Sequence, residues 1–156
     1  MRLMQKRAPH TRPSYRERLS PSLRLLAAVA LMGPMVSLVF VPVGSTFALI
    51  IGGTVSAALV ALFIWLAPVV SVEGSVLRAG RARIDTRHLG APVALTGDEA
   101  KQARGPSLPA RGWHLIRGGI DGLVVIPNID ADDPVTTWTI SSRTPDRLCA
   151  AIDAAR

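Results

Sequence analysis

The chain has 156 residues, enough for one ordinary domain and an appendage. Apolar residues make up 49% of it and charged residues 19%, a composition that excludes disordered, collagen-like and disulfide-rich classes. The formal net charge of +7 is typical of a protein with an anionic partner, so the positions of the charges matter.

The basic residues gather at the start of the chain. Residues 1–24 hold seven basic residues and one acid, residues 25–70 hold no charge, and residues 71–156 hold eleven basic and ten acidic residues. We therefore predict a basic cytoplasmic N-terminal segment over residues 1–22. We expect no nucleic-acid binding, because base stacking needs interleaved aromatic residues and this segment offers only Tyr15.

The uncharged stretch predicts a transmembrane helical hairpin over residues 23–70. As one helix its 46 residues would be ~70 Å long, whereas a bilayer core is ~30 Å thick. Turn residues over 41–46 divide the stretch into spans at 23–41 and 46–68. We expect Pro34 to kink the first span and Pro68 to mark the end of the second.

Orientation follows from the flanking charges, because Lys and Arg near a span resist translocation. Basic residues lie before the first span and after the second, and the turn carries none. We predict a multi-pass protein of the inner (plasma) membrane with both termini cytoplasmic. A secretory signal peptide is the alternative, but no Ala-x-Ala-like site follows the first span and a second apolar run comes directly after it. The flanking residues are Arg2, Lys6, Arg7, Arg12, Arg16, Arg18 and Arg24 before the hairpin, and Arg78, Arg81, Arg83 and Arg87 after it.

Small residues recur every four positions in the second span, at Gly53, Ala57 and Ala61, and the first span offers Gly33 and Ser37. Such rows allow helix backbones to approach closely. They indicate either packing of the two spans on each other or a seam between copies of the chain, and the alternatives stay open.

Residues 72–156 predict a small α+β cytoplasmic domain, mainly antiparallel β, closed by a C-terminal helix. The alternation in 136–141 and the apolar run 123–126 are typical of strands. Further strands are expected at 76–79, 82–86, 92–95 and 113–117, with a short helix at 98–104. A helix over about 145–156 is predicted by Thr144 as its cap and Pro145 at its first position.

Recognisable catalytic, metal and cofactor patterns are absent from the sequence. His10, His88 and His114 pair with no ligand at metal spacing, and the single Cys149 has no base placed beside it, so we predict no metal, no cofactor and an inert thiol. The acidic run 128–133 begins like a calcium loop, but it has Asp133 where the turn needs Gly and Thr139 where a bidentate Glu is required. We interpret the run as a polar turn.

One basic pattern suggests recognition of lipid or phosphate. Period two along residues 81–87 places Arg81, Arg83 and Arg87 on one strand face, with Asp85 among them. Basic residues close to an anionic leaflet contribute ~1 kcal/mol each to membrane attraction. The alternative is a solvated strand face that Asp85 partly neutralises.

The chain resembles a family of small actinobacterial membrane proteins, the domain-of-unknown-function family three-zero-nine-three. The resemblance rests on residues 15–19 (Tyr-Arg-Glu-Arg-Leu), the two spans, residues 80–83 (Gly-Arg-Ala-Arg), and the stretch from Asp133-Pro134 through Trp138 to residues 142–145 (Ser-Arg-Thr-Pro) and Leu148. It implies a membrane location and no activity. The arrangement is also similar to bacterial membrane proteins with pleckstrin-homology-like domains, a likeness of fold alone.

Together these features predict a non-enzymatic, membrane-anchored interaction module that contacts a protein partner or anionic lipid heads. Membrane lipids are expected partners, and a homo-oligomer through the helices remains open. The alternative is a membrane-bound enzyme whose site lacks any recognisable motif.

Overall fold

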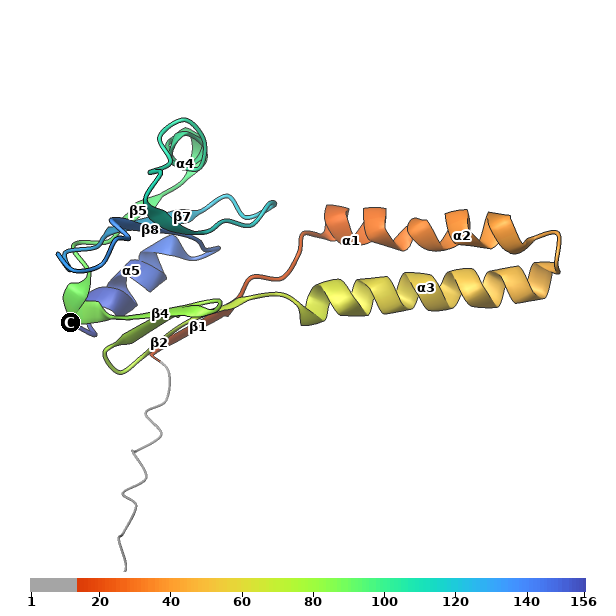
Figure 1. Cartoon of the computed structure of the whole chain (residues 1–156), viewed down its shortest axis with the longest axis horizontal. Helices are drawn as coiled ribbons and strands as arrows, with labels where there is room; N and C mark the ends of the chain where they lie inside the picture. Colours follow the sequence, from red (N-terminus) through yellow and green to blue (C-terminus); the bar gives the residue numbers. More distant parts are fainter. Residues whose placement is uncertain (1–13) are drawn as a thin grey trace, which may run out of the picture.

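The computed structural model describes residues 14–156. The predictions that concern Arg2, Lys6, Arg7, His10 and Arg12 lie outside the described residues. The described chain forms a helical hairpin and a β-rich module, and the hairpin extends away from one end of the module (Figure 1). Its helices are α1 (Leu23–Ala30), α2 (Met32–Phe40) and α3 (Ser45–Trp65).

The hairpin helices are long and apolar enough to cross a membrane. The mean hydropathy of the most apolar window is 2.0 in Leu23–Phe40 and 2.4 in Ser45–Trp65. Only 6% of the residues in the first window and 11% of those in the second are buried. A core helix of a soluble domain would be mostly buried, so the hairpin leaves its apolar side chains without cover from the described residues.

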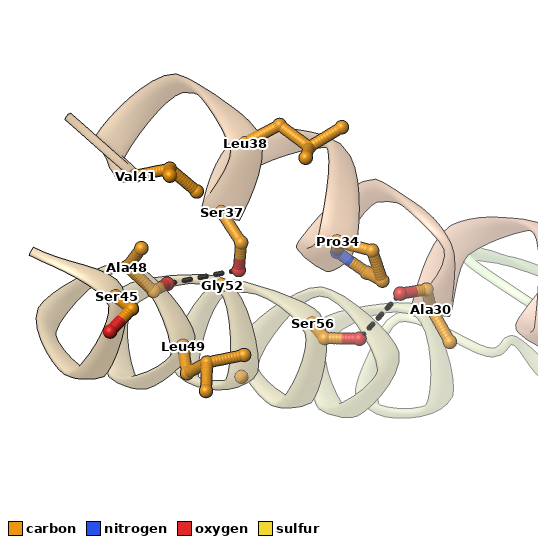
Figure 2. A pocket seen from close by; sticks show the side chains of 11 residues that line it. Ala30, Pro34, Ser37, Leu38, Val41, Ser45, Ala48, Leu49, Gly52 and Ser56 are labelled. Atoms are coloured by element: carbon orange, nitrogen blue, oxygen red, sulfur yellow. Dashed lines mark hydrogen bonds between the residues drawn. The ribbon is translucent and has the colours of Figure 1, made fainter.

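The first arm, for which a kink at Pro34 is predicted, is interrupted at Leu31, where α1 and α2 meet. Pro34 has no N–H, so it cannot bond the carbonyl of Ala30 four residues earlier. The hydroxyl of Ser56 on α3 donates to that carbonyl instead, at 2.7 Å (Figure 2). The second arm ends at Trp65, before the predicted residue 68, because the residue preceding Pro68 is disfavoured in helical conformation.

The first sheet is antiparallel, in the order β1-β2-β3-β4. Its strands are β1 (Tyr15–Arg18), β2 (Val69–Glu73), β3 (Val76–Ala79) and β4 (Ala82–Asp85), and the short helix η1 (Thr86–His88) follows. The sequence predicted neither β1 nor β2. As a result, part of the predicted N-terminal segment belongs to the β-rich module, which the hairpin interrupts.

The second sheet has the order β5-β7-β8-β6. Its strands are β5 (Val93–Leu95), β6 (Gly112–Leu115), β7 (Leu123–Pro127) and β8 (Thr137–Ser141), and β6 pairs with β8 in parallel while the other pairs are antiparallel. Helix α4 (Gly97–Ala103) lies between β5 and β6, and α5 (Pro145–Asp153) closes the chain. The predicted α+β module with a C-terminal helix is confirmed.

Both sheets share one core with α5, which lies between them (Figure 1). Alternate residues of the strands face this core, as period two requires. Leu148 and Ile152, one turn apart on α5, are fully buried. The cluster also includes Leu19, Val70, Val72, Leu77, Ala79, Leu89, Ile120, Val124, Ile126, Trp138 and Ile140. Leu19 directly follows β1 and Val70 lies in β2, the strands next to the two arms in the sequence, so the core itself anchors both arms.

Candidate anion-binding site

The three arginines predicted to share a strand face are separated in the structure. Arg81 lies in the turn between β3 and β4, Arg83 lies within β4, and Arg87 lies in η1. The predicted face was wrong for Arg87, because β4 ends at Asp85 and the alternation ends with it. The carboxylate of Asp85 accepts the Arg87 backbone N–H at 3.1 Å and so begins η1.

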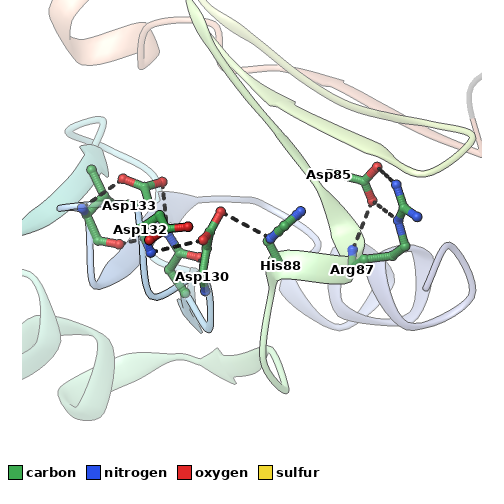
Figure 3. A network of polar contacts seen from close by, with 8 residues as sticks. Asp85, Arg87, His88, Asp130, Asp132 and Asp133 are labelled. Carbon is green, nitrogen blue, oxygen red and sulfur yellow. Dashed lines mark hydrogen bonds and ion pairs between the residues drawn. The ribbon is translucent and has the colours of Figure 1, made fainter.

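Asp85 and Arg87 form an ion pair where β4 ends, at the edge of the first sheet opposite the β3–β4 turn (Figure 3). The guanidinium of Arg87 donates to both carboxylate oxygens of Asp85, at 3.1 and 2.9 Å. The side-chain and backbone hydrogen bonds from Arg87 lower the pKa of Asp85 to about 2. This arginine is therefore already neutralised locally.

A different basic row crosses the outer face of the first sheet. The strand register aligns Arg16 on β1, Ser71 on β2, Arg78 on β3 and Arg83 on β4. None of the three arginines takes part in an ion pair within residues 14–156. Arg78 and Arg83 are directly opposite, a repulsive arrangement that a bound anion would relieve.

Arg81 belongs instead to a cleft at the hairpin side of the module. The cleft has a volume of about 400 Å³ and lies beside Leu66, the cap residue of α3. Arg81 and Arg117 supply its positive charge, and neither forms an ion pair or a side-chain hydrogen bond within residues 14–156. Its other lining residues are Pro68, Gly80, Trp113, His114, Leu115 and Ile116. The sequence analysis missed Arg117, which follows β6 and has no basic neighbour in the sequence.

The joint between hairpin and module is closed by arginine side chains. Arg18 donates to the carbonyls of Ile64 and Trp65 at the end of α3, at 3.1 Å each. These carbonyls lie at the negative end of the helix dipole, so the cation is favourably placed. Arg143, just before α5, donates to the carbonyls of Arg18 and Ser20 at 3.2 and 2.8 Å. Both arms of the hairpin are thus bonded to the module.

A carboxylate that is largely shielded from solvent lies next to this joint. Glu17 has a side chain only 13% exposed, and its oxygens accept from the hydroxyls of Tyr15 and Ser142 at 2.5 and 2.7 Å and from the Arg143 N–H at 2.8 Å. The Tyr15 hydroxyl also lies 3.0 Å from Thr144 Oγ1. These bonds use the carboxylate to hold β1 against the start of α5, which is a positioning role.

This environment shifts the acidity of the only tyrosine. Burial raises the pKa of Tyr15 above its usual value, and the hydrogen bond to Glu17 raises it further, although the bonds to Ser142 and Thr144 act in the opposite direction. Tyr15 therefore stays protonated and donates to Glu17.

The hairpin seam lies one position away from the predicted row of small residues. Gly33 of α2 packs so closely on Gly52 of α3 that a Cβ at either would collide with the backbone of the other. Ser37 donates to the Ala48 carbonyl at 2.9 Å (Figure 2), so the seam on α3 runs through Ala48, Gly52 and Ser56.

The predicted row faces outward instead. Nothing lies within 4 Å of a Cβ built on Gly53, and Ala57 and Ala61 are exposed. The structure therefore does not place this row between the two arms, and the seam between copies of the chain stays a prediction.

The acidic run forms a turn, as expected. Carboxylate and amide oxygens accept backbone N–H groups two residues ahead, as in Asn128 to Asp130 at 3.1 Å and Asp133 to Val135 at 2.9 Å. His88 reaches Asp130 at 3.1 Å (Figure 3). Within residues 14–156 no group of three or more potential ligand side chains could hold a metal ion. Burial raises the pKa of the Cys149 thiol to about 11, as expected for an unreactive thiol.

These features define a class of protein in which a helix-closed β module carries two helices of membrane-spanning length. The chain belongs to the family described as "Protein of unknown function (DUF3093)", whose profile matches residues 14–152. No curated protein and no solved structure matches it. The motif residues Tyr15 and Glu17 at one end of the match contact Ser142 and Arg143 near the other.

Proposed function

We propose that this is an integral plasma-membrane protein whose module acts by binding rather than by catalysis. The observation that carries the proposal is the joint: Leu19 N–H bonds the Pro68 carbonyl at 2.9 Å, and Arg18 and Arg143 bond the adjacent backbone. A module bonded to both arms of a spanning hairpin is held at one height and orientation on the bilayer.

Insertion of the hairpin is supported by its dimensions and its ends. At ~1.5 Å per residue α3 is about 32 Å long, which matches a hydrocarbon core of ~30 Å. Trp65, at its last position, is 74% exposed, and exposed tryptophans favour the level of the lipid head groups. Arg18 lies at the same level, where its charge can remain solvated.

The orientation follows from the charges that flank the helices. Arginines surround the module end of the hairpin, whereas the turn after α2 has no charged residue. The positive-inside rule supports a cytoplasmic location for the module and both termini.

A binding role is supported by the unpaired arginines on the first sheet and in the cleft, which suit an acidic protein partner or anionic lipid heads. Glu17, whose side chain is 13% exposed, already accepts three hydrogen bonds from the same fold, which favours a structural role over a catalytic one. We propose the likeness to pleckstrin-homology-like domains at the level of two sheets and a closing helix only.

Cysteine accessibility in intact cells tests this proposal. In a Cys149→Ala background, Val43→Cys in the hairpin turn should react with a membrane-impermeant maleimide outside the cell. Arg156→Cys should react only after lysis, and both variants should resist alkaline extraction from the membrane. Labelling of Arg156→Cys in intact cells would contradict the orientation, and release by alkaline extraction would contradict insertion.

A further inference from the structure

We propose that the cleft between the end of α3, the β3–β4 turn and the end of β6 binds the phosphate head group of an anionic phospholipid. This inference rests on the proposed membrane insertion and names the ligand class of the cleft. Its ligand would bind between Arg81 and Arg117, at the level where α3 ends.

The cleft lies at the right height for a head group. Gly80 donates to the Val69 carbonyl at 3.0 Å, which holds the β3–β4 turn against the first residues after α3. A Cβ built on Gly80 would lie 3.7 Å from Pro68 and 3.5 Å from Leu115, so the turn also contacts the opposite wall. Leu66, the cap of α3, lines the same cleft. The cleft therefore opens where the hydrocarbon core of the bilayer would end.

The charges of the cleft suit a phosphodiester. Two guanidinium groups without a carboxylate partner in the described part of the chain line it, and no Asp or Glu is among its lining residues. Arg117 is partly buried, so its unpaired charge costs more than that of a fully solvated arginine. Guanidinium groups bind phosphate oxygens through two parallel hydrogen bonds, which makes a phosphate the best-matched anion.

The walls of the cleft distinguish a lipid from a free anion. Leu66, Leu115 and Ile116 give it an apolar side next to the polar one. A lipid presents the same combination, since its phosphate is followed by glycerol and acyl chains. Inorganic phosphate would leave the apolar side unused.

The basic row across the first sheet supports the same site at longer range. Arg78 and Arg83 lie two residues, or ~7 Å, farther along the strands from the hairpin than the β3–β4 turn. That distance is within one Debye length of the head groups at physiological salt, ~8 Å. These arginines would thus attract anionic lipid to the cleft without contacting it.

Lipid titration of the full chain in detergent tests the inference, with native mass spectrometry to count bound lipid. We expect dioleoyl phosphatidylglycerol to bind about tenfold more tightly than dioleoyl phosphatidylcholine. The double variant Arg81→Gln with Arg117→Gln should lose this preference. Arg87→Gln with Arg111→Gln is the matched control. Arg87 follows β4 and Arg111 precedes β6, so this variant removes the same charge from the strand ends away from the cleft and should keep the preference.

Three outcomes would overturn the inference. Equal binding of the two lipids by the wild type would show no selective site. An equal loss of the lipid preference in the control variant would show a general effect of net charge. Full competition by inorganic phosphate at the lipid concentration would assign the cleft to a free anion. Circular dichroism melts of all variants verify folding, and the single changes Arg81→Gln and Arg117→Gln replace the double variant if it unfolds. Alkaline extraction of the same samples reports insertion separately, so a failed inference is distinguishable from a failed membrane assignment.

Discussion

Ser142 donates a hydrogen bond of 2.7 Å to a carboxylate oxygen of Glu17, which lies 125 residues earlier in the chain. The bond joins β1, which precedes the hairpin, to the segment that opens α5. The bond thus joins the part of the module that precedes the hairpin in the sequence to the part that follows it. Glu17 therefore links the strand before the hairpin to the start of the closing helix.

Replacing Glu17 by Ala should lower the free energy of unfolding of the module by about 2–3 kcal/mol, because the Arg143 N–H and two hydroxyls lose a buried, charged acceptor. Glu17→Gln keeps one acceptor oxygen and should cost about half as much. Denaturant titration of the detergent-solubilised chain measures both. The exposed Glu99→Ala serves as control, and an equal loss there would contradict the prediction.

The titration of Tyr15 should reveal the same contact. It is the only tyrosine, so its ionisation can be followed by near-ultraviolet absorbance without interference from another phenol. We expect a midpoint above the ordinary 10.0 in the folded chain and a lower one in Glu17→Gln, because the neutral amide removes the coulombic effect of the carboxylate and is a weaker hydrogen-bond acceptor. Because the folded pKa is raised, this tyrosine contributes stability that is complete below pH 10.0 and is lost as pH rises through the folded value. A wild-type midpoint at or below 10.0 would contradict the contact.

Substitutions at two neighbouring glycines of α3 test which of its faces packs against the first arm. Gly52→Leu should destabilise the hairpin by about 1–3 kcal/mol or force its arms apart, because its side chain would meet Gly33 and Ser37. Gly53→Leu should be tolerated, since nothing lies within 4 Å of its Cβ position. Thermal stability in detergent compares the two. A larger loss for Gly53→Leu would instead favour a seam between copies of the chain.

Cys149 should react slowly with alkylating reagents. A pKa raised from 9.0 to about 11 lowers its thiolate fraction at neutral pH roughly a hundredfold relative to an unperturbed thiol. Alkylation by iodoacetamide, followed by mass spectrometry, should be slow in the folded chain and faster after denaturation. Since the folded pKa is raised, stability from the neutral thiol should decline as pH rises from 9.0 through about 11. Equal rates in both states would contradict the burial of this thiol.

The positions of the arginines show what a local sequence pattern can and cannot predict. Period two along residues 81–87 was a sound rule for a strand, but Asp85 ended the strand by accepting the Arg87 N–H. Arg16 and Arg78 align with Arg83 only through strand pairing, and Arg117 shares a cleft with Arg81 only because the end of β6 lies near the β3–β4 turn. Contacts of this kind have no periodicity in the sequence, because the chain between the partners can have any length.

The sequence by itself determined the apolar hairpin, its central turn and the closing helix at Pro145, since each depends on composition or on interactions within a few residues. It also predicted most strands of the module. Only the tertiary structure decided that β1 belongs to the first sheet and that Glu17 holds Ser142. The tertiary structure likewise decided which small residues form the seam and that Arg81 lines a cleft with Arg117 and not with Arg87. The physical reason is that these contacts join segments brought together by a shared core, whose geometry no local pattern encodes.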